Sequence, residues 1–282
     1  MFKRIAFKLF GNIIKPYVDY FDTLKMNLRK ADMSITIIDY LSCLFFISLV
    51  TFIVSLLSVS VLVALSIIDF AYSYTLGIIL SIVFSGAAFF MGYYYPTIKK
   101  KTLQTRIDRA LPFATSYMAT SASSGMNPVD IFKMLSLKGG VIGKEANKIY
   151  TNVVSMGMNL TTAIQKSANR SPSPQFSDLL WGMSSVITSG GNLEEYLRGR
   201  TRSFMSQYRR MLNDYAKQIT LYTEIYITLI IVGSLFFIIL IAIISPITGM
   251  NVLLLQTFIV FILIPAVSAG FIVLLKGISP TE

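Results

Sequence analysis

Long apolar runs alternate with polar stretches along the chain. Tyr40 to Ile68 and Phe70 to Ile98 contain no Asp, Glu, Lys or Arg, and the uncharged run from Ile225 to Leu275 is long enough for two crossings. A helix that crosses a bilayer needs about 20 apolar residues. The pattern therefore predicts four transmembrane helices.

The last run needs a break, and the segment "SPITGMN" from Ser245 to Asn251 supplies one. Pro246 cannot continue a regular helix and Gly249 permits a turn. We expect helices at Ile225 to Ile244 and Val252 to Leu275, with Pro265 as a candidate kink in the second.

The polar region between the two membrane pairs predicts helices. Apolar residues recur at helical spacing, as at Leu111, Ala114 and Met118, and alternating β-branched runs are scarce. A Gly-x-Asn phrase occurs three times, with its glycines 32 and 33 residues apart. The phrase consists of Gly125 with Asn127, Gly157 with Asn159, and Gly190 with Asn192.

Each phrase is typical of a corner between two helices. Glycine takes the left-handed conformation that ends a helix without steric cost, and asparagine is a favoured N-cap for the next helix. Three corners predict six antiparallel helices, at 101–124, 128–137, 144–156, 160–169, 174–189 and from 192 onward. The sixth has no stop signal before Ile244, so we expect it to continue into the third membrane helix. A repeated structural unit and unrelated corners both give this architecture.

The expected fold class is therefore an all-α membrane protein, with four transmembrane helices flanking one cytoplasmic six-helix bundle. The expected domains are a basic N-terminal segment (1–35), the first transmembrane pair (36–98), the bundle (99–218), the second pair (219–276) and a short tail (277–282).

Composition and charge agree with a multi-pass protein of the cell membrane. Of 282 residues, 54% are apolar and 14% are charged. All 25 basic residues lie outside the short connections expected at Asp69 to Ser73 and Ser245 to Asn251. By the positive-inside rule, both termini and the central region are cytoplasmic. Residues 1–35 mix apolar and basic positions, which suits either a helix on an anionic membrane surface or a simple flanking helix.

Several kinds of chemistry are excluded by what the sequence lacks. The chain has no histidine and one cysteine, Cys43, so thiolate or imidazole metal sites and Ser-His triads are ruled out or nearly so. No phosphate loop with its Gly-Lys-Ser/Thr ending occurs. We expect no enzyme activity, no cofactor, no metal and no nucleic-acid partner.

Two sites are candidates for interaction. Arg198, Arg202 and Arg209 fall on one face of a helix and form a basic stripe. The stripe suits a solvated or headgroup-facing surface, or a protein docking surface, and nucleic acid is the least favoured reading. Glu224 lies at the cytoplasmic edge of the third membrane helix, where it is either functional or paired with a cation such as Lys217.

The segments "ALPFATSYMATSASSGMNPVDIFKML", "GMNLTTAIQKSANRSPSPQFSDLL" and "SGGNLEEYL", with Glu145 between the first two, resemble the type II secretion system F domain. That family includes membrane platform proteins of type IV pili, type II secretion, tight-adherence pili and archaella. Many members carry two F domains, whereas this chain carries one. An acidic residue common before the third corner is replaced here by Val186, Ile187 and Thr188. The arrangement is closer to the tight-adherence and archaeal branches.

The resemblance implies a non-catalytic platform that couples a cytoplasmic hexameric ATPase to insertion of pilin-like or archaellin subunits. The basic stripe would then face the ATPase. A homodimer or a second platform subunit is left open, and so is a chain that forms half of a longer protein. The alternative class is a small membrane transporter or channel component, because four spans with Glu224 at an edge could line a path. The mostly apolar spans argue against it.

Overall fold

The computed structural model describes all residues except 1–6, 8, 12–13, 65–69, 249–256 and 279–282. The described residues form helices joined by short turns, with no strand among them. The chain divides into two compact units, Met1–Thr201 and Arg202–Glu282, which are considered separately.

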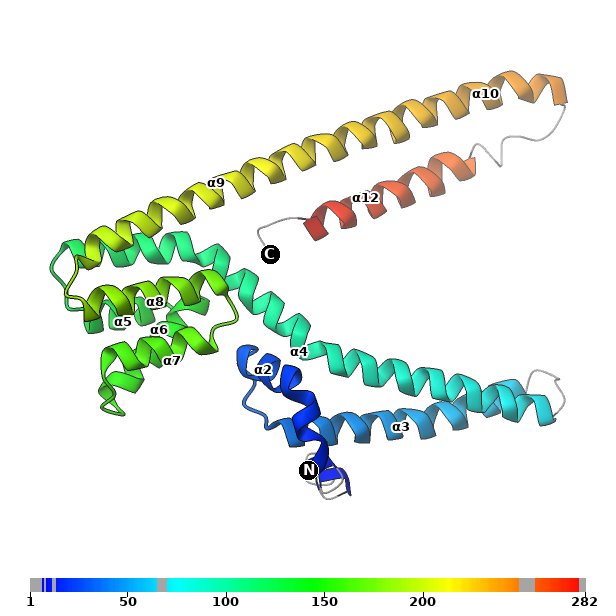
Figure 1. Ribbon diagram of the computed structural model, residues 1–282. Helices are drawn as coiled ribbons and strands as arrows, with labels where there is room; N and C mark the ends of the chain where they lie inside the picture. Colours follow the sequence, from blue (N-terminus) through cyan, green and yellow to red (C-terminus); the bar gives the residue numbers. More distant parts are fainter. Residues whose placement is uncertain (1–6, 8, 12–13, 65–69, 249–256, 279–282) are drawn as a thin grey trace. The chain divides into compact units, whose positions relative to one another are not determined.

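The first unit contains the first predicted membrane pair. Helices α3 (Ile37–Ala64) and α4 (Phe70–Ser123) pack against each other in antiparallel fashion (Figure 1). The Tyr40 hydroxyl donates to the Gly92 carbonyl at 2.6 Å, and the Ser48 and Ser85 hydroxyl oxygens lie 2.8 Å apart. Such hydrogen bonds stabilise helix pairs in apolar surroundings, where water cannot compete for the same groups.

Helix α4 corrects the expected boundary between membrane and bundle. We predicted a membrane helix ending near Ile98 and a separate bundle helix at 101–124, but one helix runs from Phe70 to Ser123. Pro96 and Pro112 both lie inside it. The Lys99-Lys100-Lys101 triplet therefore does not interrupt the helix.

The later part of the N-terminal segment packs against the first helix pair. After the 3₁₀ turn η1 (Lys15–Phe21), helix α2 (Asp22–Lys30) buries Leu24 and Leu28 in a cluster with Ile37 and Leu41 of α3. Asn27 donates to the Thr97 hydroxyl at 3.2 Å and accepts from Lys100 at 3.1 Å. The apolar side of α2 thus contacts α3 and α4 and is not available to lie on lipid.

The bundle comprises the end of α4, helices α5 (Pro128–Leu137), α6 (Gly140–Val154), α7 (Leu160–Arg170) and α8 (Pro174–Thr188), and the start of α9 (Leu193–Tyr226). α5 pairs with α6 and α7 pairs with α8, and α4 contacts α5, α6 and α8 (Figure 1). The bundle core includes Ile107, Leu111, Met118, Ile131, Phe132, Ile149, Ile164, Leu179, Leu180 and Met183, each at most 1% exposed. The Ser173 hydroxyl caps α8 and donates to Asp108 of α4, which joins these two helices.

The corners have the geometry of helix ends and N-caps. Gly125, Gly157 and Gly190 have φ of +72°, +64° and +68°. In each corner the residue after the glycine donates a backbone hydrogen bond to a carbonyl five or six residues before it, as Met126 does to Ser121 at 3.4 Å. The asparagine side chains accept from the backbone of Val129, Thr161 and Glu195 at 3.0 to 3.1 Å.

Helix α9 begins in the first unit and continues in the second. It passes through a π-helical segment, η2 (Ile227–Val232), into α10 (Gly233–Thr248). The predicted end at Ile244 is wrong, because α10 includes Pro246 and runs to Thr248. Residues 249–256, where the rest of the predicted turn falls, lie outside the described part of the chain.

Within the described residues, three helical stretches are long and apolar enough to cross a membrane: Ile37–Val59, Gly77–Ser123 and Leu193–Ile243. The region of the fourth predicted span is described as η3 (Ile259–Leu263) and α12 (Ile264–Ile278), in which the apolar helix Val260–Val273 is shorter than a crossing requires. The four-span layout is therefore not confirmed.

Candidate functional site

The predicted basic stripe lies on an exposed face of α9. Arg198, Arg202 and Arg209 are all solvent-exposed, and helical spacing places them within about 40° of one another. The Arg198 Nε atom lies 2.7 Å from Glu194 Oε1 one turn earlier. Because this pair is exposed, it contributes little to stability and the arginine stays accessible to a partner.

The start of α9 is fixed to α8 by one tyrosine. The Tyr196 hydroxyl donates to the Leu179 carbonyl at 3.1 Å, and Arg200 Nε donates to the same hydroxyl at 3.2 Å. Gly182 makes this approach possible, since a methyl group added there would overlap the Tyr196 hydroxyl. This contact sets the position from which the exposed arginine face of α9 begins.

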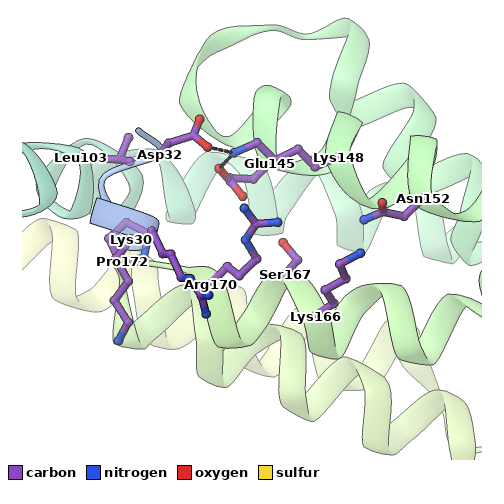
Figure 2. Close-up of a pocket in the computed structure, with 11 residues that line it drawn as sticks. Lys30, Asp32, Leu103, Glu145, Lys148, Asn152, Lys166, Ser167, Arg170 and Pro172 are labelled. Carbon is purple, nitrogen blue, oxygen red and sulfur yellow. Dashed lines mark hydrogen bonds and ion pairs between the residues drawn. The ribbon is translucent and has the colours of Figure 1, made fainter. Parts of the chain in front are cut away.

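A charged pocket that we did not predict lies between α2, α6 and α7. It is lined by Arg29, Lys30, Asp32, Leu103, Glu145, Lys148, Asn152, Lys166, Ser167, Arg170 and Pro172. Figure 2 shows Glu145 and Lys148 extending from α6 toward the side that Ser167 of α7 also faces. Leu103 of α4 and Asp32, just after α2, complete the wall, so three segments distant in sequence meet here.

Lys148 joins two of these segments. Its ammonium group lies 2.7 Å from Asp32 Oδ1 and 2.8 Å from Glu145 Oε1. The Glu145 side chain is only 10% exposed, whereas those of Lys148 and Asp32 are 42% and 53% exposed. Lys148 is thus the partner of a buried carboxylate as well as the contact to the segment after α2.

The surroundings of Lys148 shift the pKa of its ammonium group. Burial lowers the pKa of Lys148, but hydrogen bonds and charges from Asp32 and Glu145 outweigh burial and raise it above the ordinary value of 10.5. Lys148 is therefore charged at physiological pH.

Sequence reasoning identified Glu145 only through the family resemblance. Lys148, three residues later, could have been proposed as its partner from helical spacing. Asp32 could not, because 116 residues separate it from Lys148 and no local pattern links them.

Glu224 lies on the exposed surface of α9. The ion pairs found among the described residues do not include it, so the proposed pairing with Lys217 is not observed there. Two residues further, Tyr226 contacts α12: its ring centre lies 4.7 Å from that of Phe271, and its hydroxyl lies 3.1 Å from Ser268 Oγ. In the described part of the chain, no group of three or more His, Cys, Asp or Glu side chains could hold a metal ion.

Residues 114–241 match the model of the family described as type II secretion system (T2SS), protein F. This part of the chain is similar to the type II secretion system F domain. The match begins in the bundle part of α4 and ends in α10, and it confirms the resemblance found in the sequence.

Two archaeal relatives are similar over part of this region. Flagella accessory protein J of Methanocaldococcus jannaschii is 26% identical over 137 residues, which are 48% of this chain and 24% of the relative. Flagella accessory protein J of Methanococcus voltae is 27% identical over 155 residues, 54% of this chain and 27% of the relative. The similarity thus spans about a quarter of each relative. No solved structure matches the chain.

Proposed function

We propose that this protein is a membrane platform for assembly of a type IV pilus-like filament, in the archaeal branch that includes the archaellum. The observation that carries the proposal is the F domain at residues 114–241, built on helices that also contain long apolar segments. Both relatives are named as flagellar accessory proteins, which supports the same class of machine.

The proposed action is mechanical. A hexameric secretion ATPase would bind the bundle from the cytoplasm, and the movement would pass into the membrane helices to insert pilin-like or archaellin subunits. Two features support this coupling: α4 contains both an apolar segment and bundle residues, and the helical conformation runs from Leu193 through η2 to Thr248. Unbroken helices transmit displacement better than flexible linkers do.

We place the ATPase dock on the arginine face of α9. Arg198, Arg202 and Arg209 are exposed cations on one side of a helix, in a bundle region whose net charge is +10. Complementary charge raises association rates and fixes orientation. The partner surface would therefore be acidic, and binding would weaken with added salt.

The test is co-purification of the detergent-extracted protein with its candidate ATPase. Reversing Arg198, Arg202 and Arg209 to Glu should weaken ATPase binding by at least about tenfold and lower its salt dependence. Matched reversals of Lys101, Lys133 and Lys144 change the net charge equally while leaving α9 intact. Equal binding by both triple variants would reject the dock on α9. Normal filaments in a strain lacking this protein would overturn the platform function itself.

The transporter or channel alternative gains no specific support. In the first unit, Tyr40, Ser48 and Ser85 bond across α3 and α4. These polar groups join the two helices, and their hydrogen bonds are used within the pair. The same proposal includes either a homodimer or a complex with a second platform subunit. The molecular mass of the detergent-extracted complex distinguishes the two.

A further inference from the structure

The charged pocket between α2, α6 and α7 has more cations than its own carboxylates require. Lys148 pairs with both Asp32 and Glu145. The remaining cations that line the pocket are Arg29, Lys30, Lys166 and Arg170. None of these four has a carboxylate oxygen within 4.0 Å among the residues that the structure describes. The pocket therefore carries an excess positive charge that its own residues leave uncompensated.

A buried hydroxyl at the same pocket lacks a partner. Ser167 is 7% exposed, and its Oγ atom makes no hydrogen bond within the described structure. A serine in a helix ordinarily donates to the carbonyl four residues earlier when nothing else is available. Buried hydroxyls without partners are costly. In Figure 2 the Ser167 hydroxyl points from α7 toward the side on which Glu145 lies, and an arginine guanidinium group stands between the two.

The size of the pocket restricts what could occupy it. Its volume is about 30 Å³. A cavity that holds one water molecule needs about 10–15 Å³, so this pocket has room for about two waters or for the oxygens of one small anion. A whole nucleotide does not fit.

We propose that this pocket binds a single phosphoryl group. Ser167 would donate to one phosphate oxygen, and the cations of α2 and α7 would neutralise the charge, with arginine suited to paired contacts with phosphate oxygens. The negative charge of Glu145 remains neutralised by Lys148, so the bound anion experiences a net positive electrostatic potential.

The phosphoryl group has two possible sources, a lipid headgroup or free phosphate. Arg29 and Lys30 precede the first membrane helix, which begins at Ile37, by only seven or eight residues. Leu103 lies two residues after the Lys99-Lys100-Lys101 triplet in α4. The pocket is therefore close along the chain to the ends of two apolar helices, and a headgroup is within reach.

The experiment measures thermal unfolding of the full-length protein through fluorescence of its single tryptophan, Trp181. In detergent, sodium phosphate is titrated against sodium chloride of equal ionic strength. In nanodiscs, phosphatidic acid is compared with phosphatidylserine at equal surface charge. Stabilisation by phosphate in detergent identifies free phosphate as a ligand. Stabilisation by phosphatidic acid alone identifies a lipid headgroup.

The decisive variant is Ser167→Ala. This substitution should lower the affinity for the phosphoryl ligand about tenfold, since one hydrogen bond to a charged group is lost. Without ligand it should be at least as stable as the unchanged protein, because an unsatisfied buried hydroxyl is removed. Arg170→Gln should also weaken binding, and Lys133→Gln on α5 should not. Ligand affinity unchanged in Ser167→Ala, or no preference for phosphate and phosphatidic acid over their controls, would overturn the proposal.

Discussion

At the residue scale, Gly182 determines how closely α8 and α9 approach. A methyl group there would overlap the Tyr196 hydroxyl, and the tyrosine ring cannot move aside without losing its hydrogen bond to Leu179. We expect Gly182→Ala to destabilise the protein by about 1–3 kcal/mol, the usual cost of overpacking. Thermal unfolding followed through the adjacent Trp181 measures this directly.

Gly199 provides the matched control. It also lies inside a helix, α9, but an added methyl group would have no heavy atom within 4 Å. Gly199→Ala should therefore stabilise by about 0.5–1 kcal/mol through helix propensity. If both variants shift unfolding in the same direction, close approach at Gly182 is not the cause.

At the element scale, the corners are local devices that end one helix and begin the next. Gly125 has φ of +72°, and the space around it is open, so Gly125→Ala pays only the backbone cost of the left-handed conformation, about 1 kcal/mol. Asn127→Ala loses the cap on Val129 and should also cost about 1 kcal/mol. Urea or thermal unfolding of each variant checks the values. Gly125→Asn should be milder than Gly125→Ala, because asparagine tolerates that conformation.

The corners also show what sequence could predict. The α5 bounds, Pro128–Leu137, agree with the predicted helix at 128–137, because capping and termination depend on neighbouring residues. The continuity of α4 was missed because the uncharged run ends at Ile98 and the three lysines after it mark the start of the polar region, although lysine favours helices. The pocket at Lys148 was missed for a different reason: its walls come from α2, α6 and α7, and only tertiary packing brings them together.

Lys148 links the segment after α2 to α6, and its two partners differ in burial. Lys148→Met leaves the buried Glu145 carboxylate unpaired and should destabilise by about 1–3 kcal/mol. Asp32→Asn removes only an exposed pair and should cost less than about 0.5 kcal/mol. Thermal unfolding of the two variants at pH 7 compares them. Equal losses would show that Glu145 does not depend on Lys148.

The raised pKa of Lys148 predicts that the stability of the folded protein depends on pH. The pKa of Lys148 is raised above 10.5 in the folded protein, so the folded state holds its proton more tightly than the unfolded chain does. The stabilisation is therefore complete below about pH 10.5 and is lost as the pH rises through the folded pKa. The difference in melting temperature between the unchanged protein and Lys148→Met should be constant from about pH 7 to 9 and shrink above it. A difference that shrank below about pH 9 would contradict this assignment.

At the scale of the whole molecule, the proposed function depends on α9 as a mechanical connection. Arg198, Arg202 and Arg209 precede Lys217, and the apolar helices follow it. Lys217→Pro removes a backbone donor and breaks helical geometry at a cost of about 3 kcal/mol, whereas Lys217→Ala removes the same charge and keeps the helix. Filaments are counted by electron microscopy in cells carrying each variant.

Coupling through α9 predicts a specific separation of properties in Lys217→Pro. ATPase binding should persist, because the arginine face and the contact between Tyr196 and Leu179 lie before the break. Filament number should fall by at least about tenfold, while Lys217→Ala assembles normally and both variants reach the membrane in equal amounts. If Lys217→Pro still makes normal filaments, force does not pass through this part of α9. The other helix that contains both bundle residues and an apolar segment, α4, would then be the route to test, since it alone among the described helices of the first unit has that composition.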